Sequence, residues 1–132
     1  MFLIPKDSAE NKLMVSVHYV DNEKYWMNQI GSQEWLDYID YQCDKLVSAF
    51  KENNIPVFLG ETTSIYPESN FDANAIHTDS SECLEIVLDK LTGLGFVPVL
   101  WDVNDNFYSR TDCKIKNEKD AEVIKKVADK IR

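Results

Sequence analysis

Residues 55–61 read Ile55-Pro56-Val57-Phe58-Leu59-Gly60-Glu61, a short apolar run that ends on a glycine and a carboxylate. A continuous run of apolar and β-branched residues of this length is typical of a buried strand in a parallel sheet. The carboxyl ends of parallel strands are where α/β proteins bind ligands and carry out chemistry. Glu61 is therefore a candidate functional residue, although a single Glu after a strand is more often a solvated loop residue or a charge at a helix start.

Two further apolar stretches predict strands, one before and one after this run. Residues 13–20 alternate between two faces, and the face that carries His18 becomes more polar towards the end of the strand. Residues 96–101 form the third run, which ends at Trp101 and is followed by Asp102. The stretches without such a pattern are expected to be loops: residues 1–11, 21–31, 62–78 and 103–116.

Apolar residues at three- and four-residue steps predict three helices. Their expected ranges are residues 32–53, 79–94 and 117–131. Ser32, Asp79 and Asn117 are the expected N-caps, and Glu82 stands where a capping box begun by Asp79 would place it. The resulting order is β-α-β-α-β-α, with helices long enough to cross between parallel strands. The chain is thus expected to be a single α/β domain over residues 1–132.

All three predicted strands end at the same edge of a parallel sheet, so His18, Glu61 and Trp101 are expected to converge there. His18 has a simpler interpretation as a strand histidine bonded to a carbonyl, and Trp101 as a core side chain. A tryptophan at the mouth of a sheet is, however, well suited to stacking on the apolar face of a sugar ring. Residues 102–106 faintly resemble a calcium loop but lack its glycine and distal Glu, so we expect no metal site.

Composition excludes some partners. The formal charge of −9, from 23 acids and 14 bases, argues against a nucleic acid or an anionic membrane as the partner and is easier to reconcile with a neutral substrate. No apolar run approaches the length of a transmembrane helix, and residues 1–4 are too short and lack the basic flank of a signal peptide. Because an export signal can be removed, a cytoplasmic location and a secreted one both stay open.

The three cysteines, Cys43, Cys83 and Cys113, are odd in number and widely spaced. They form no Cys-x-x-Cys motif and have no histidine at ligand spacing. We interpret them mainly as buried apolar residues rather than as metal ligands or disulfide partners.

Three segments resemble strand motifs of glycoside hydrolase family 5, the bacterial endoglucanase-type cellulases. Residues 12–19, 55–61 and 98–102 are similar to the sixth, seventh and eighth strand motifs, in that order and at the family's spacing. The likeness extends over almost the whole chain. It implies a partial (β/α)8 TIM barrel, of which this chain would form the last three β/α units, since a complete barrel needs about 250 residues.

The resemblance also implies roles for individual residues. In the family, the Glu that ends the seventh strand is the nucleophile in retaining hydrolysis of β-linked glucans, and this role falls on Glu61. His18 would help shape the catalytic subsite and Trp101 would be the sugar-stacking platform, with Trp26 and Asp102 as further substrate-binding residues. No cofactor is implied. A polysaccharide substrate implies a secreted protein.

The sequence departs from the family in ways that bear on activity. Retaining hydrolysis needs a second carboxyl group about 5 to 5.5 Å from the nucleophile, and the family's Asn-Glu-Pro motif that supplies it does not occur in residues 1–132. The tyrosine expected two positions after His18 is Val20, while Tyr19 points to the opposite face. Two further motifs are altered, to Gly60-Glu61-Thr62-Thr63 and Leu100-Trp101. We therefore expect little or no hydrolase activity from the isolated chain.

Two other functions fit the sequence. Three β/α units leave two open strand edges and an uncovered sheet face, which suits a non-catalytic carbohydrate-binding module or a half-barrel that self-associates into a homo-oligomer. A flavodoxin-like regulator has the same order of elements. Three strands are too few for that fold, however, and no Gly-rich phosphate loop follows the first strand.

Overall fold

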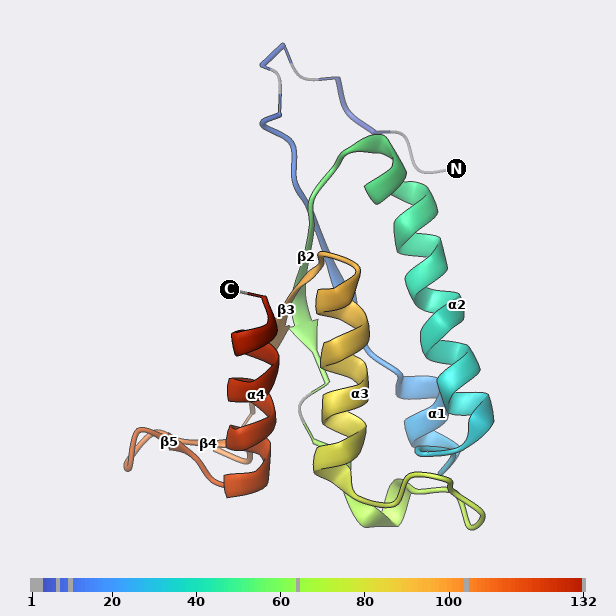
Figure 1. Cartoon of the computed structure of the whole chain (residues 1–132), viewed down its shortest axis with the longest axis vertical. Helices are drawn as coiled ribbons and strands as arrows, with labels where there is room; N and C mark the ends of the chain where they lie inside the picture. The colour runs from blue at the N-terminus through green and yellow to red at the C-terminus, as the bar shows by residue number, and fades with distance from the viewer. Residues whose placement is uncertain (1–3, 7, 10, 64, 104, 132) are drawn as a thin grey trace.

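The computed structural model describes residues 4–6, 8–9, 11–63, 65–103 and 105–131. The elements are β1 (Val15–Tyr19), α1 (Asn22–Trp26), α2 (Gln33–Ala49), η1 (Lys51–Asn53), β2 (Val57–Thr62), η2 (Glu68–Asn70), α3 (Ser80–Gly93), β3 (Val97–Leu100), β4 (Tyr108–Ser109), β5 (Lys114–Ile115) and α4 (Glu118–Lys130). Strands β1, β2 and β3 form one parallel sheet in that order. Helices α2, α3 and α4 lie side by side on one face of this sheet (Figure 1). The predicted β-α-β-α-β-α order is confirmed.

Three regions predicted to be loops contain regular structure, and the smallest case is the three-residue 3-10 helix η2 within residues 62–78. Helix α1 lies within residues 21–31, and the antiparallel pair β4–β5 lies within residues 103–116. Helix α1 has five residues, none of them buried, so it has no apolar stripe for sequence periodicity to detect. Each strand of the pair has only two residues, too few to show alternation. Parts of the predicted loop 1–11, and Asn104 of the calcium-like stretch, lie outside the described residues.

The three predicted N-caps are confirmed. The Ser32 side chain accepts a hydrogen bond from the backbone N–H of Trp35, and Asn117 accepts one from Lys119. Asp79 accepts from the backbone N–H groups of Ser81 and Glu82. The Glu82 carboxylate pairs instead with His77 Nδ1 at 3.0 Å, so only the Asp79 half of the capping box is present.

The hydrophobic core lies between the sheet and the three long helices. Val57 and Leu59 of β2 point into it and are 2% and 0% exposed. The opposite face of the sheet is bare: Val97 and Val99 of β3 are 53% and 39% exposed, and Ser16 of β1 is also exposed. Parallel sheets are normally covered on both faces, so this arrangement leaves unusual apolar surface in solvent.

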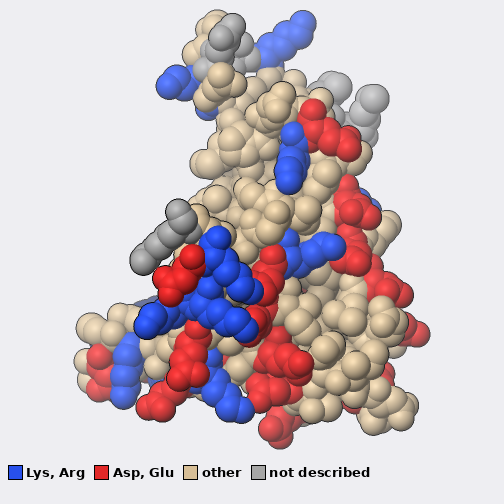
Figure 2. Space-filling model, in the orientation of Figure 1, with Lys and Arg blue, Asp and Glu red and all other residues tan. Residues whose placement is uncertain are grey.

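Helices α3 and α4 are joined by ion pairs as well as by apolar packing. Figure 2 shows lysine side chains of α4 beside acidic side chains of α3. The pairs are Lys119–Asp79, Lys126–Glu85 and Lys130–Asp89. Exposed pairs of this kind contribute about 0 to 1 kcal/mol each, so most of the contact energy comes from buried side chains such as Val123 and Val127.

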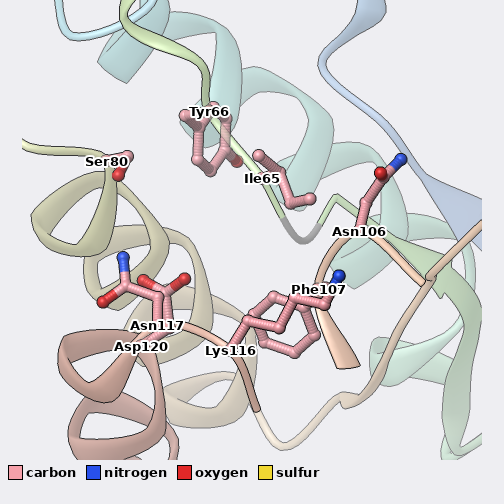
Figure 3. A pocket seen from close by; sticks show the side chains of 8 residues that line it. All are labelled: Ile65, Tyr66, Ser80, Asn106, Phe107, Lys116, Asn117 and Asp120. Carbon is pink, nitrogen blue, oxygen red and sulfur yellow. The ribbon is translucent and has the colours of Figure 1, made fainter. Parts of the chain in front are cut away.

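A small cavity of about 200 Å³ lies where the first turns of α3 and α4 meet the β4–β5 pair (Figure 3). Asp120 of α4 points into this region and is only 8% exposed. Ser81 Oγ donates a hydrogen bond of 2.6 Å to its carboxyl group. Burial raises the pKa of Asp120, and the nearby Asp79 carboxylate adds to this rise.

Asp120→Asn is expected to stabilise the protein at neutral pH. The folded-state pKa of Asp120 is raised. The contribution of its carboxyl group to the stability of the fold is therefore fully present below the unfolded-state pKa and is lost as the pH rises through the folded-state pKa. Asparagine keeps an acceptor for Ser81 without the cost of burying a charge. The urea midpoint should therefore rise at about pH 7 and stay unchanged at about pH 3, where the carboxyl group is protonated in both states.

The exposed Asp44 of α2 provides a control, because Asp44→Asn should leave the midpoint unchanged at both pH values. A fall in the midpoint of Asp120→Asn at neutral pH would contradict the prediction. It would mean that the attraction of the carboxylate to the N-terminus of α4, typically about 0.3 to 1 kcal/mol, outweighs the cost of burial.

Candidate active site

The face on which Glu61 lies is decided by an irregularity in the pairing of β2. Strict alternation would put Glu61 on the same buried face as Val57 and Leu59. The register to β1 instead advances by two residues on β2 for one on β1: Val17 pairs with Leu59, and His18 pairs with Glu61. This is a β-bulge, and it turns Glu61 to the bare face of the sheet.

Gly60 is the residue that the register passes over. A Cβ atom at this position would lie 3.2 Å from Ser16 Oγ, closer than ordinary side-chain contacts. Beyond the bulge the alternation resumes, with Thr62 fully buried and 37% of the Glu61 side chain exposed. A glycine inside an apolar strand is a usual sequence sign of such a bulge.

His18 and Glu61 meet at the end of the paired strands. His18 Nδ1 lies 3.3 Å from Glu61 Oε2, and the two side chains are 57% and 37% exposed. A histidine in this position can orient the carboxylate by donating from Nδ1. The structure therefore brings together the two residues that the sequence assigned to catalysis.

The pair opens into a groove of about 800 Å³. All five predicted site residues line it: His18, Glu61, Trp26, Trp101 and Asp102. None of the five lines the small cavity of Figure 3. The groove is thus the candidate active site.

Two exposed indole rings border the groove. Trp26 is the last residue of α1 and is 75% exposed, and its ring meets that of Tyr25 edge-on with centroids 5.3 Å apart. Trp101 follows β3 and is 52% exposed, and its backbone N–H donates to the carbonyl of Thr62 at 3.0 Å. Flat, exposed tryptophans of this kind suit the apolar faces of sugar rings.

Asp102 organises the loop that follows Trp101. Its carboxylate accepts hydrogen bonds from the backbone N–H groups of Asn106, Phe107 and Tyr108 at 3.1, 2.9 and 3.1 Å. These bonds, that of Phe107 first, hold the pKa of Asp102 below its usual value. The carboxylate therefore shapes the wall of the groove, and its predicted contact with substrate stays a prediction.

The departure from the family at the position after Tyr19 is visible in the structure. The Tyr19 side chain is 3% exposed and belongs to the core on the helix side of the sheet. Val20 lines the groove in its place. Neither residue supplies the hydroxyl group that the family's tyrosine would bring to Glu61.

The cysteines match their interpretation in two of three cases. Cys43 and Cys83 are buried, and burial raises their pKa values to about 11 and about 12. Cys113 is exposed, and the prediction of burial is wrong for this residue. The reason is that Cys113 lies in the short β4–β5 connection rather than on the apolar face of a helix.

Within the described residues, no group of three or more His, Cys, Asp or Glu could hold a metal ion.

The described part of the chain also contains no helix that is both long enough and apolar enough to cross a bilayer.

Comparison with known proteins identifies the family. Residues 1–107 match the cellulase family, glycosyl hydrolase family 5. The chain belongs to glycosyl hydrolase family 5. No protein with a curated description matches it significantly.

Solved structures of family 5 enzymes share the fold. A GH5-4 broad specificity endoglucanase from an uncultured bovine rumen ciliate superposes with a TM-score of 0.78 at 23% identity, over 98% of this chain and 43% of that one. A Bacteroides ovatus GH5 xyloglucanase in complex with a XXXG heptasaccharide gives 0.70 at 20% identity, over 97% and 32%. A GH5 lichenase from Caldicellulosiruptor sp. F32 in complex with cellotetraose gives 0.72 at 23% identity, over 96% and 38%.

The family 5 chain therefore spans less than half the length of these structural neighbours. Its three-stranded parallel sheet with helices on one face corresponds to part of their barrel. The bare face of the sheet is the face that a closed barrel would turn towards its interior.

Sequence reasoning found five of the residues that line the groove but missed two features of it. The first is helix α1, which carries Trp26 and has no periodic signal. The second is Asp21, a buried carboxylate in the wall of the groove, which the sequence placed in a loop. Its position directly after β1, at the end where ligands bind, was the available signal.

Proposed function

We propose that this family 5 chain carries the nucleophile half of a retaining endo-β-1,4-glucanase site, with Glu61 as the nucleophile. The observation that carries the proposal is the contact of His18 Nδ1 with Glu61 Oε2 at 3.3 Å, on the floor of a groove bordered by two exposed tryptophans. His18 orients the carboxylate, and Trp26 and Trp101 support the sugar rings. Because polysaccharide substrates are found outside the cell, this proposal implies a secreted protein.

The chemistry needs two carboxyl groups. Glu61 attacks the anomeric carbon and forms a glycosyl ester, while an acid donates its proton to the departing glycosidic oxygen; water then hydrolyses the ester. Among the described residues that line the groove, the other two acids are Asp21 and Asp102. Asp21 is 1% exposed and Asp102 is held by three backbone groups, so neither is placed to protonate the leaving oxygen.

The substrate class follows from the groove and from the charge of the chain. Two indole platforms and a net charge of −9 favour a neutral polysaccharide over an anionic one. Two of the structural neighbours hold a xyloglucan-type heptasaccharide and cellotetraose. We therefore propose β-linked glucans and xyloglucans as the ligands of this chain.

Glu61 is expected to react with a substrate that needs no acid. A fluorinated dinitrophenyl β-cellobioside suits this test, because its leaving group departs without protonation and its fluorine slows hydrolysis of the ester. Mass spectrometry should find one adduct, on Glu61. Turnover of cellotetraose should be undetectable, since general acid catalysis contributes about 10² to 10⁴ in rate.

Glu61→Gln should abolish the adduct, whereas Glu82→Gln, on α3 and outside the groove, should leave it unchanged. The absence of an adduct on the wild-type chain, or an adduct on another carboxylate, would contradict the assignment of the nucleophile.

The exposure of both tryptophans favours a second candidate, a carbohydrate-binding module without hydrolysis. In this case Trp101→Ala and Trp26→Ala should each weaken binding of cellotetraose or a xyloglucan oligosaccharide, by about fivefold if a stacking contact contributes about 1 kcal/mol. Calorimetry measures the affinity, and a reducing-sugar assay measures hydrolysis. Tyr41→Ala removes an exposed aromatic ring from α2, outside the groove, and should have no effect. Unchanged affinity in both tryptophan variants would rule out the indoles as platforms.

The bare sheet face and the open edges of β1 and β3 further favour self-association of the chain. Sedimentation should show dimers or larger species at concentrations above about 10 μM, with apolar burial as the driving force. Val99→Lys places a charge on the bare face and should shift the population to monomers, whereas Tyr41→Lys on α2 should not. A strictly monomeric wild-type chain at these concentrations would contradict this proposal.

A further inference from the structure

The wall of the groove contains a buried carboxylate that the proposed chemistry does not use. Asp21 follows the end of β1 and is 1% exposed. Trp35 Nε1 donates a hydrogen bond of 2.7 Å to its Oδ2 atom, and Thr63 Oγ1 donates one of 3.0 Å to its Oδ1 atom. One carboxylate therefore ties the first turn of α2 to the segment that follows β2.

The surroundings of Asp21 are apolar and aromatic. Trp35 is 0% exposed and Tyr66 is 1% exposed, and their rings meet edge-on with centroids 5.9 Å apart. Burial raises the pKa of the Tyr66 hydroxyl well above its usual value, and the Asp21 carboxylate raises it further. A carboxylate in such a site is costly unless donors satisfy it, and Trp35 and Thr63 are the donors.

The position of this carboxylate relates it to the catalytic pair. Asp21 is three residues after His18, and Thr63 is two residues after Glu61. The hydrogen bond between them therefore joins the ends of β1 and β2 just beyond the pair. It lies past the bulge at Gly60, after which β1 and β2 pair for only two more residues, His18 with Glu61 and Tyr19 with Thr62.

We propose that Asp21 is a positioning residue of the site. Its carboxylate accepts a hydrogen bond from the Thr63 hydroxyl group and so fixes the end of β2, with the result that Glu61 Oε2 faces His18 Nδ1. The buried indole of Trp35 anchors the carboxylate from the other side. This inference rests on the proposed function only in naming Glu61 as the nucleophile. The geometry itself can be tested without activity.

The test uses the protonation pattern of the His18 ring. A hydrogen bond from Nδ1–H to Glu61 holds the neutral imidazole in the tautomer with its proton on Nδ1. Nitrogen NMR of the neutral ring distinguishes this tautomer from the one protonated on Nε2. The chain has 2 histidines, and His77, with Nδ1 3.0 Å from Glu82 Oε1, serves as an internal reference.

Thr63→Val removes the hydroxyl group and keeps the shape of the side chain. We expect the His18 ring to change from mainly Nδ1–H to mainly Nε2–H, with His77 unchanged. Thr63→Ser restores a hydroxyl group and should restore the wild-type His18 signal. Thr92→Val is the matched control. Thr92 Oγ1 also donates one hydrogen bond, of 2.7 Å to the carbonyl of Leu88 within α3, and neither residue lines the groove.

A purely structural role would give a different result. Thr63→Val and Thr92→Val would then both lower the urea midpoint while the His18 tautomer stayed as in the wild type, and this outcome would overturn the proposal. If Thr63→Val does not fold, Thr63→Ala takes its place, since it also removes the hydroxyl group that donates to Asp21 Oδ1. An unchanged Nδ1–H tautomer of His18 in folded Thr63→Ala would overturn the proposal.

The two proposals fail independently. If His18 responds to Thr63→Val as expected but no adduct forms on Glu61, the positioning by Asp21 stands and the nucleophile assignment falls. If an adduct forms on Glu61 and His18 does not respond, the positioning by Asp21 falls alone.

Discussion

The site depends on the bulge at Gly60. A strand alternates its side chains between two faces, so a carboxylate two residues after Leu59 would otherwise enter the core among apolar side chains. One extra residue in β2 reverses that outcome and pairs Glu61 with His18 on the open face. Burial of a charge would be costly there, whereas at the bare face the carboxylate keeps solvent and a histidine partner. The bulge therefore determines whether the carboxylate of Glu61 lies at the open face of the sheet or is buried in the apolar core.

The bare face of the sheet connects the fold to the function. Three helices cover one side of β1, β2 and β3, and the valines of β3 remain in solvent on the other. The same face carries the contact between His18 and Glu61. A polypeptide that covered this face would remove apolar surface from water and could bring a second carboxylate opposite Glu61. Among the described residues, the open side thus leaves both apolar surface uncovered and Glu61 without a second carboxyl group placed to act as an acid.

The sequence predicted the elements whose residues repeat and missed those whose residues do not. The strands and long helices have apolar periodicity and capping residues such as Ser32 and Asp79, and these signals were confirmed. Helix α1 and the β4–β5 pair are too short to repeat a pattern. Convergence of His18 and Glu61 followed from the common edge of parallel strands, but the alternation of β2 taken alone would have buried Glu61. Gly60 is the local sequence sign of the bulge that turns Glu61 to the open face.

The three acids of the groove illustrate why position alone does not define a catalytic residue. Asp21 gives its two oxygens to Trp35 and Thr63, and Asp102 accepts from three backbone N–H groups. Their lone pairs are engaged in holding the protein's own structure. Glu61 is 37% exposed and meets a single histidine nitrogen, so it retains lone pairs directed at the groove. A nucleophile requires such a lone pair, and a general acid requires a proton facing the substrate. Among the described residues of the groove, Glu61 meets the first requirement and no carboxyl group is placed to meet the second.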